Sequence, residues 1–344
     1  MKSLNKIIKW SILALVIELA GFFYVDRFYL AGITSFNMKN VELKKVEVKK
    51  KLDVQIPQKA KAISISYDGK FASYILNGGV KVVNRESGNE TSVKLFQGTK
   101  ATNLIWLPDR NIMHIAEKGN NFVKFSAYDA FKDVNTQWND EKLKEIKISL
   151  PNSQYEVKDL ALSVNTNVRY ISVGNSSRSI IYRVDIMNTL TKQKEYFSKI
   201  GRIGIMQLED RFIYEDLSKK QLYIEGYPNI FKDKILNNPC FLGADFDDMA
   251  YLGSRNGDKV TKIYYGLLKT PIRNWKSITL PTGVTRENIS ISIDGDIYIN
   301  NALVGNIINL KTNKKSDYSG KLIAVYKDGI VSMEDNTLKE NKLN

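Results

Sequence analysis

The sequence predicts an all-β protein, a β-propeller of seven blades with six or eight as alternatives, preceded by one N-terminal transmembrane helix. Two observations lead to this prediction. A single apolar stretch near the N-terminus could enter a bilayer. Beyond it, tight-turn pairs recur at intervals of about 34 to 57 residues, a repeat length typical of propeller blades. The turn pairs are Asp68-Gly69, Asp109-Arg110, Thr166-Asn167, Asp210-Arg211, Asp247-Asp248, Asp294-Gly295 and Asp328-Gly329.

The first part of the chain is predicted to be a signal anchor, with a short cytoplasmic basic segment at 1–9, a transmembrane helix at 10–30 and a juxtamembrane linker at 31–43. A spanning helix needs about 17–25 residues, and the apolar run Trp10–Val25 reaches that length with its flanking isoleucines. Glu18 and Leu19 occupy positions where signal-peptide cleavage requires small residues, so we expect an uncleaved anchor. The lysines before the helix place the N-terminus in the cytoplasm and the remaining chain outside.

Glu18 is an ionisable residue inside the predicted membrane helix. Such a residue is costly in a bilayer and commonly has a partner. One interpretation is a helix–helix contact with another membrane protein. The other is a protonated side chain, or one near the interface of a short tilted helix.

The propeller is predicted to span 44–344 and to be closed by a strand at 44–56. The last repeat unit lacks a fourth strand, which this N-terminal strand could supply, so that no strand edge stays open. Its lysines could form a basic patch facing lipid headgroups or a wall polymer, or could simply protect a solvated edge strand from aggregation. These lysines are Lys44, Lys45, Lys49, Lys50 and Lys51.

Each turn pair separates two β-rich runs, and third and fourth runs follow in most units. In the first unit the four predicted strands are Ala62–Ser66, Phe71–Leu76, Val80–Asn84 and Ser92–Phe96. Asp and Gly suit these turns because they tolerate a positive φ and because Asp bonds to nearby backbone.

Two hairpins carry a family resemblance. Ser64–Tyr74 and Leu104–His114 resemble blades of TolB-like and dipeptidyl-peptidase N-terminal-type (WD40-like) propellers, which have a Ser-Pro-Asp-Gly-Lys-like hairpin. The resemblance covers 60–344 and implies the fold without a specific activity. The peptidase relatives add an α/β-hydrolase domain, for which this sequence shows no counterpart.

The longest interval between turns contains an insertion at Asp129–Lys144, predicted to be a long hairpin loop or a short helix. Phe131 and Trp138 lie among its polar residues and are candidate partner-binding residues, since exposed aromatics on loops of a rigid scaffold commonly bind proteins. The alternative is that both rings fold back over the outer side of their blade.

Catalytic and metal motifs are missing from the sequence. His114 is the one histidine and lies at strand spacing, which favours a packed residue over a general base. Together with the one cysteine, Cys240, it cannot form a His/Cys zinc cluster. The acidic residues that could be argued as calcium ligands fit turn chemistry better: they are Asp245, Asp247, Asp248, Asp294 and Asp296. We therefore predict no catalytic, cofactor or metal site.

These observations predict a membrane-anchored, extracytoplasmic, non-catalytic protein-binding or scaffolding module of the cell envelope. A net charge of +14 also allows a receptor for an anionic envelope polymer or glycan. A third class, a hydrolase or lyase in the central channel, has no identifiable acid–base pair. Nucleic acid is not an expected partner, because the anchor places the domain outside the cytoplasm.

Overall fold

The computed structural model describes residues 2–30, 51–196, 199–231 and 235–344. Contacts divide the chain into two units, Met1–Lys49 and Lys50–Asn344. In the first, α1 (Lys2–Tyr24) continues into the π-helical turn η1 (Val25–Leu30). Its stretch Ile8–Phe28 has a mean hydropathy of 1.8 over 21 residues and is long and apolar enough to cross a membrane, a property that signal sequences share. Glu18 lies within this stretch.

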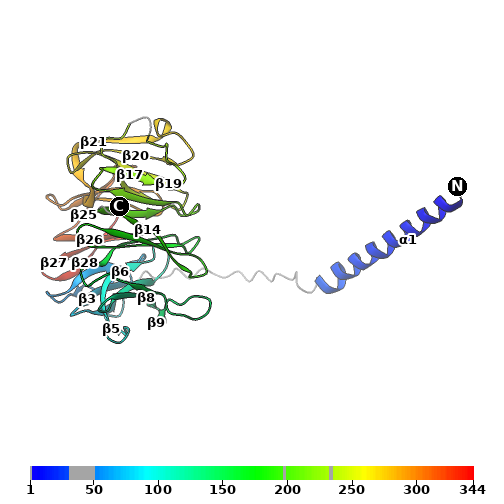
Figure 1. Ribbon diagram of the computed structural model, residues 1–344, viewed down its shortest axis with the longest axis horizontal. Helices are drawn as coiled ribbons and strands as arrows, with labels where there is room; N and C mark the ends of the chain where they lie inside the picture. Colours follow the sequence, from blue (N-terminus) through cyan, green and yellow to red (C-terminus); the bar gives the residue numbers. More distant parts are fainter. Residues whose placement is uncertain (1, 31–50, 197–198, 232–234) are drawn as a thin grey trace. The chain divides into compact units, whose positions relative to one another are not determined.

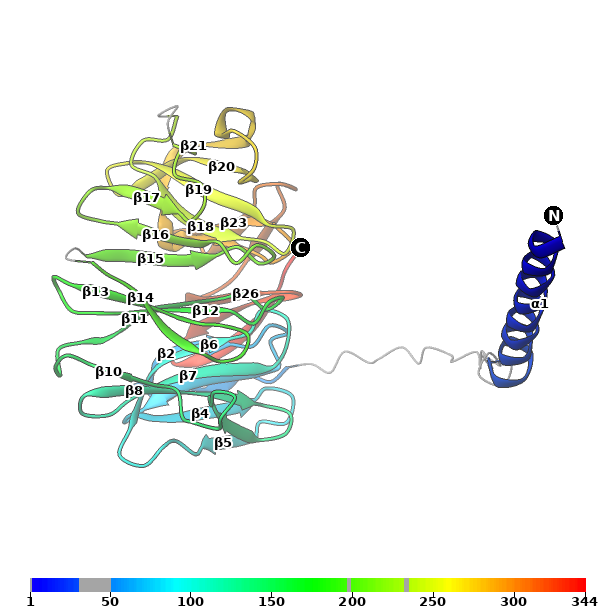
Figure 2. The same cartoon turned by 45° about the vertical axis from the view of Figure 1, so that its right-hand side comes forward.

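The second unit is a seven-bladed β-propeller, so the predicted fold class and its seven-blade form are confirmed. Each blade is an antiparallel sheet. In Figures 1 and 2 the colours run from the cyan blade through green and yellow to the red blade, which returns beside the cyan one. Contacts between β2 (Lys61–Ile65) of the first blade and β26 (Lys321–Tyr326) of the last join the two ends of the ring.

The first three blades contain these strands: β2 (Lys61–Ile65), β3 (Phe71–Leu76), β4 (Gly79–Asn84) and β5 (Glu90–Val93) in blade 1; β6 (Lys100–Trp106), β7 (Ile112–Lys118), β8 (Phe122–Asp129), β9 (Val134–Gln137) and β10 (Lys147–Ser149) in blade 2; β11 (Glu156–Leu162), β12 (Arg169–Gly174), β13 (Ser179–Val184) and β14 (Leu190–Tyr196) in blade 3.

The other four blades contain β15 (Ile200–Ile205), β16 (Phe212–Asp216) and β17 (Gln221–Ile224) in blade 4; β18 (Cys240–Ala244), β19 (Met249–Asn256), β20 (Lys259–Leu267) and β21 (Lys276–Thr285) in blade 5; β22 (Ile289–Ile291), β23 (Ile297–Asn301), β24 (Asn306–Asn309) and β25 (Lys315–Asp317) in blade 6; β26 (Lys321–Tyr326), β27 (Gly329–Glu334), β28 (Thr337–Lys342) and β1 (Val54–Gln55) in blade 7. Short 3₁₀ turns, η2 (Ile272–Asn274) and η3 (Arg286–Asn288), flank β21.

All seven predicted turn pairs connect the first strand of a blade to its second. They therefore share one end of the ring, which we call the turn face. Their polar groups also join neighbouring blades, a role that local turn chemistry does not predict. Asn111 Nδ2 donates to Asp68 Oδ2 at 2.9 Å, and Asp248 Oδ1 accepts from Leu208 N at 2.8 Å. The Asp68 carboxylate thus bonds both to its own turn and to the adjacent blade, whereas the Asp248 carboxylate bonds to the adjacent blade.

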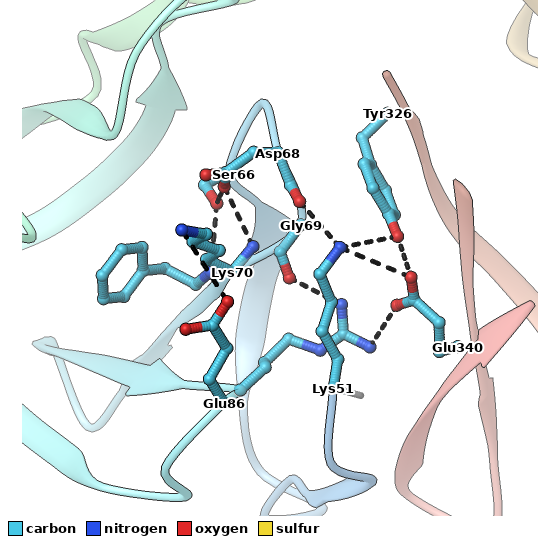
Figure 3. A network of polar contacts seen from close by, with 10 residues as sticks. Lys51, Ser66, Asp68, Gly69, Lys70, Glu86, Tyr326 and Glu340 are labelled. Carbon is cyan, nitrogen blue, oxygen red and sulfur yellow. Dashed lines mark hydrogen bonds and ion pairs between the residues drawn. The ribbon is translucent and has the colours of Figure 1, made fainter. Parts of the chain in front are cut away.

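The ring closes through β1, which pairs with β28 as the outer strand of blade 7. This strand is the final part of the range 44–56 expected to close the propeller, and 44–50 lies outside the described residues. Lys51 precedes it and reaches back into the ring (Figure 3). Its Nζ donates to the Asp68 carbonyl at 2.7 Å and to Tyr326 Oη at 2.9 Å.

Glu340 completes this closure contact. It forms ion pairs with Lys51, at 3.5 Å, and with Arg85, at 2.8 Å. Arg85 is fully buried and also donates to the Gly69 carbonyl at 2.8 Å. One carboxylate of the last strand therefore joins the first blade to the segment that enters the ring (Figure 3).

The insertion in blade 2 interrupts the outer strand rather than extending a loop. Both β9 and β10 pair with β8, and the chain between them leaves the sheet as a small hairpin closed by an Asn139–Glu145 bridge. Backbone bonds from Trp138 N to the Phe125 carbonyl and from Ile146 N to the Trp138 carbonyl hold its base against the blade. This excursion accounts for the longest interval between turns.

Candidate functional site

Blade 4 differs from the other six because its sheet has three strands, ordered β15-β16-β17. Within the described residues no strand pairs with the outer edge of β17. The chain that follows, Glu225–Pro239, forms turns where its structure is described, and its Pro228, Pro239 and Gly226 suit turns better than strands. The short strand β17 is therefore an open edge as far as the described residues show.

The register shows which backbone groups this edge presents. Glu225 N donates to the Phe212 carbonyl at 2.9 Å, and Tyr223 lies opposite Tyr214. Backbone groups alternate in direction along a strand, so Leu222 and Ile224 direct theirs away from β16. The Ile224 carbonyl accepts from Tyr227 N at 3.1 Å. In the described part of the chain, the Leu222 N–H, the Leu222 carbonyl and the Ile224 N–H have no hydrogen-bond partner.

A groove of about 930 Å³ runs along this edge. A row of stacked aromatic rings lines it from blade 3 to the outer strand of blade 4. Ring centroids lie 4.3 Å apart for Tyr170 and Phe212, 5.6 Å for Phe212 and Tyr214, and 4.9 Å for Tyr214 and Tyr223. Tyr170 and Phe212 are buried, whereas Tyr214 and Tyr223 are half-buried, so the outer rings offer the accessible apolar surface.

The polar residues of the groove carry both charges. Lys219 and Lys220 occupy the turn between β16 and β17, and Glu225 follows the strand. The Lys219 ammonium lies 3.7 Å from the Asp216 carboxylate, while Lys220 is exposed with no ion pair in the described residues. The turn end of the groove is therefore the more positive end.

The two aromatic residues expected to bind a partner, Phe131 and Trp138, differ in their exposure to solvent. Phe131 is 66% exposed, in edge contact with Phe71 at 5.4 Å. Trp138 is 5% exposed, so the alternative of a ring folded back over its blade applies to Trp138 and not to Phe131. The Trp138 ring stacks on Phe125 at 5.0 Å and meets the His114 ring edge-on at 4.8 Å, because the base of the insertion hairpin is bonded to β8.

Of the five lysines in the predicted basic patch, the structure describes Lys51. Lys44, Lys45, Lys49 and Lys50 lie outside the described residues. Lys51 is not a free surface cation, since its ammonium is bound by Tyr326 and Glu340 and its side chain is 12% exposed. A closing segment that must cross from blade 1 to blade 7 explains this burial.

The residues considered as catalytic groups or metal ligands are buried or hydrogen-bonded within the propeller. His114 is buried in β7, as its strand spacing predicts, and Cys240 is a buried free thiol. Asp245 accepts hydrogen bonds from Met249 N at 2.9 Å and Tyr251 Oη at 2.8 Å. Among the described residues, no group of three or more His, Cys, Asp and Glu side chains is placed to hold a metal ion.

Sequence reasoning missed the groove on blade 4. The signal available was the absence of a β-rich run between Ile224 and Cys240, where each of the other units except the last supplies its own outer strand. The stacking of Tyr170 on Phe212 could not be read from spacing, because those residues lie on different blades.

No family model and no curated protein matches this sequence. Solved structures match at the level of fold. A chain of a mitotic checkpoint complex is 12% identical, with a TM-score of 0.50 over 90% of this chain and 98% of that one. An oligogalacturonate lyase in complex with manganese is 9% identical, with a TM-score of 0.52 over 82% and 88%. Hsv2 of Kluyvelomyces marxianus is 11% identical, with a TM-score of 0.48 over 80% and 89%. At these identities the first two similarities establish the propeller fold alone.

Proposed function

We propose that this protein is a membrane-anchored, extracytoplasmic and non-catalytic protein-binding module, and that its partner docks an extended peptide along β17. The open edge of blade 4 carries the proposal, because it is a sheet edge beside an aromatic groove. The apolar helix supports anchoring, and the lysines that precede it support an outward-facing propeller.

An extended peptide fits the unpaired backbone groups of the edge. Added as a fourth strand, it would exchange hydrogen bonds with the Leu222 N–H and carbonyl and with the Ile224 N–H. Native proteins usually cover or shorten such edges because they recruit other strands. Here the edge is short, which limits adventitious pairing while leaving enough groups for a specific peptide.

Side chains of the groove define the preferred peptide. On a strand, every second side chain faces the same side. Those facing the tyrosine row would be aromatic or aliphatic, since the half-buried Tyr214 and Tyr223 present flat apolar surface. An acidic residue at the turn end would pair with Lys220, which forms no ion pair in the described residues.

Site-specific photo-crosslinking in native membranes tests the location. A photoreactive phenylalanine analogue replacing Gln221, an exposed residue of β17, should crosslink to a discrete partner. The matched control replaces Lys315, an exposed residue on the outer strand of the four-stranded blade 6. Combining the Gln221 probe with Tyr223→Ser should remove the crosslink, because the apolar platform is lost.

Hydrogen exchange then tests the mode of binding. With the crosslinked partner purified and added back, strand addition slows exchange of the Leu222 and Ile224 amides. The Tyr223 amide already bonds to β16 and should change less. Crosslinks of equal yield from the control position, or protection confined to the turn face, would refute the proposed docking site.

A further inference from the structure

A pocket of about 260 Å³ lies at the turn face, where the first strands of four consecutive blades of the ring end. Blades 6, 7, 1 and 2 each contribute residues to it, from the ends of β22, β26, β2 and β6 and from the turns that follow them. First strands of neighbouring blades contact one another, as β2 does with β6 and with β26. The pocket therefore lies at the mouth of the central channel of the propeller.

Aliphatic side chains form a large part of the lining of this axial pocket. Three of them, Ile291, Ile293 and Val325, are half-buried, so they keep surface that a ligand can contact. The other aliphatic residues of the lining are Ile65, Leu107 and Pro108. A concave apolar surface with a few polar groups is typical of small-molecule sites. The volume is small for such a site and suits a ligand of the size of a single amino acid.

Three charged side chains also line the axial pocket. Asp294 and Asp296 lie on either side of Gly295 in the turn of blade 6, and Lys327 follows β26 in blade 7. Asp294 and Lys327 are exposed and Asp296 is half-buried, so a ligand can reach all three. None of them forms an ion pair within the described residues. The pocket therefore offers charges of both signs that are not neutralised by each other.

The two carboxylates lie close to the phenol of Tyr298. Asp296 Oδ2 accepts a hydrogen bond from Tyr298 Oη at 3.3 Å. Burial and the charges of Asp296 and Asp294 raise the pKa of Tyr298 to about 12, so the phenol keeps its proton at neutral pH. Asp296 Oδ1 and both carboxylate oxygens of Asp294 accept no hydrogen bond within the described residues. These oxygens can accept hydrogen bonds from an ammonium group, which has three donors.

We propose that the axial pocket binds a free aliphatic α-amino acid, with its ammonium on Asp294 and Asp296, its carboxylate on Lys327 and its side chain against the aliphatic lining. Each part of such a ligand meets a group of complementary chemistry. A primary amine lacks the carboxylate that would pair with Lys327, and a carboxylic acid without an ammonium is repelled by the two aspartates. The inference does not depend on the peptide-binding proposal, because the axial pocket and the blade 4 groove share no residue.

The test uses the full chain in a non-ionic detergent and measures binding by calorimetry at neutral pH. Leucine carries all three groups, isoamylamine lacks the carboxylate, isocaproate lacks the ammonium, and glycine lacks the side chain. We expect isoamylamine to bind about fivefold more weakly than leucine, because one exposed ion pair is lost. Isocaproate and glycine should bind more weakly than leucine by about tenfold or more, because isocaproate loses the charged hydrogen bonds and glycine loses the apolar contact. Leucine that binds no more tightly than isocaproate would overturn the proposal.

Variants assign each charge of the ligand to a residue of the pocket. Asp294→Asn should weaken the binding of leucine and of isoamylamine by about tenfold, because a charged hydrogen bond to the ammonium is lost. The matched control is Asp328→Asn, at an exposed aspartate beside Lys327 that does not line the pocket, and it should leave both affinities unchanged. Lys327→Gln should remove the preference for leucine over isoamylamine while keeping isoamylamine binding. A preference that survives Lys327→Gln, or leucine binding unaffected by Asp294→Asn, would also overturn the proposal. The ligand comparison on the native protein decides the matter even if a variant fails to fold.

Discussion

His114 should make the stability of the propeller depend on pH. The side chain is 7% exposed in β7, and burial, reinforced by the charge of Arg169, lowers its pKa to about 3. The hydrogen bond to the Ser126 backbone opposes this shift without cancelling it. A histidine in the unfolded chain titrates near 6.5, so the two states differ in bound protons between these values.

The direction of the effect follows from that difference. Between pH of about 6.5 and 3 the unfolded chain binds the proton that the folded protein rejects, so the free energy of unfolding falls as the pH falls. From pH 7 to pH 5 this one residue should cost about 2 kcal/mol. The other cation facing it, Arg169, stays protonated throughout this range and adds no slope.

Urea unfolding at pH 7 and pH 5 measures this quantity in native protein and in His114→Gln. A glutamine amide can still donate to the Ser126 backbone but does not titrate. Carboxylates contribute equally to the pH dependence of both proteins. Subtracting the variant's loss of unfolding free energy from that of the native protein therefore leaves the contribution of His114. We expect the native protein to lose about 2 kcal/mol more than the variant. Equal losses in the two proteins would show that His114 is protonated without strain in the folded state, and the reasoning would be wrong.

Two further predictions concern the insertion and the ring closure. Trp138→Ala should lower the free energy of unfolding by about 3–5 kcal/mol because the ring is buried, whereas Phe131→Ala, on an exposed ring, should stay within about 1 kcal/mol in the same urea titration. Equal effects of the two substitutions would contradict the observed burial. Glu340→Ala should cost about 3–5 kcal/mol because it leaves the fully buried Arg85 without its anion, while Glu334→Ala, in an exposed pair with Lys339, serves as the control in thermal unfolding. A loss no larger than that of the control would show that the closure contact contributes little.

Local chemistry made the blades predictable. Asp68-Gly69 and Asp294-Gly295 are turns because Gly69 and Gly295 adopt positive φ, at 71° and 80°. Strand alternation on either side then identifies the first two strands of each blade. The closing role of β1 followed from counting strands in the last unit. Burial of His114 followed from its strand spacing. All these inferences use interactions between residues close in the sequence, or a simple count of repeats.

The N-terminal apolar helix was predictable for a similar reason. Length and composition decide whether a helix can cross a bilayer, and both are properties of the continuous segment Ile8–Phe28. Predicting this helix therefore needs no information about tertiary contacts. The contact that would involve Glu18 is different, because it depends on another molecule.

Only the tertiary structure decided which polar and aromatic residues share a site. The polar sequence neighbours of Trp138 left its exposure undecided, and pairing of the hairpin base with β8 places the ring on Phe125 and His114. The burial of Arg169 beside His114 depends on packing between blades 2 and 3, and no motif around Arg169 indicates it. The groove at β17 lies where the described sheet of blade 4 stops at three strands, and residues of blade 3 line it as well. Each outcome rests on contacts between residues of different strands or blades, and the sequence repeats that define the blades carry no information about them.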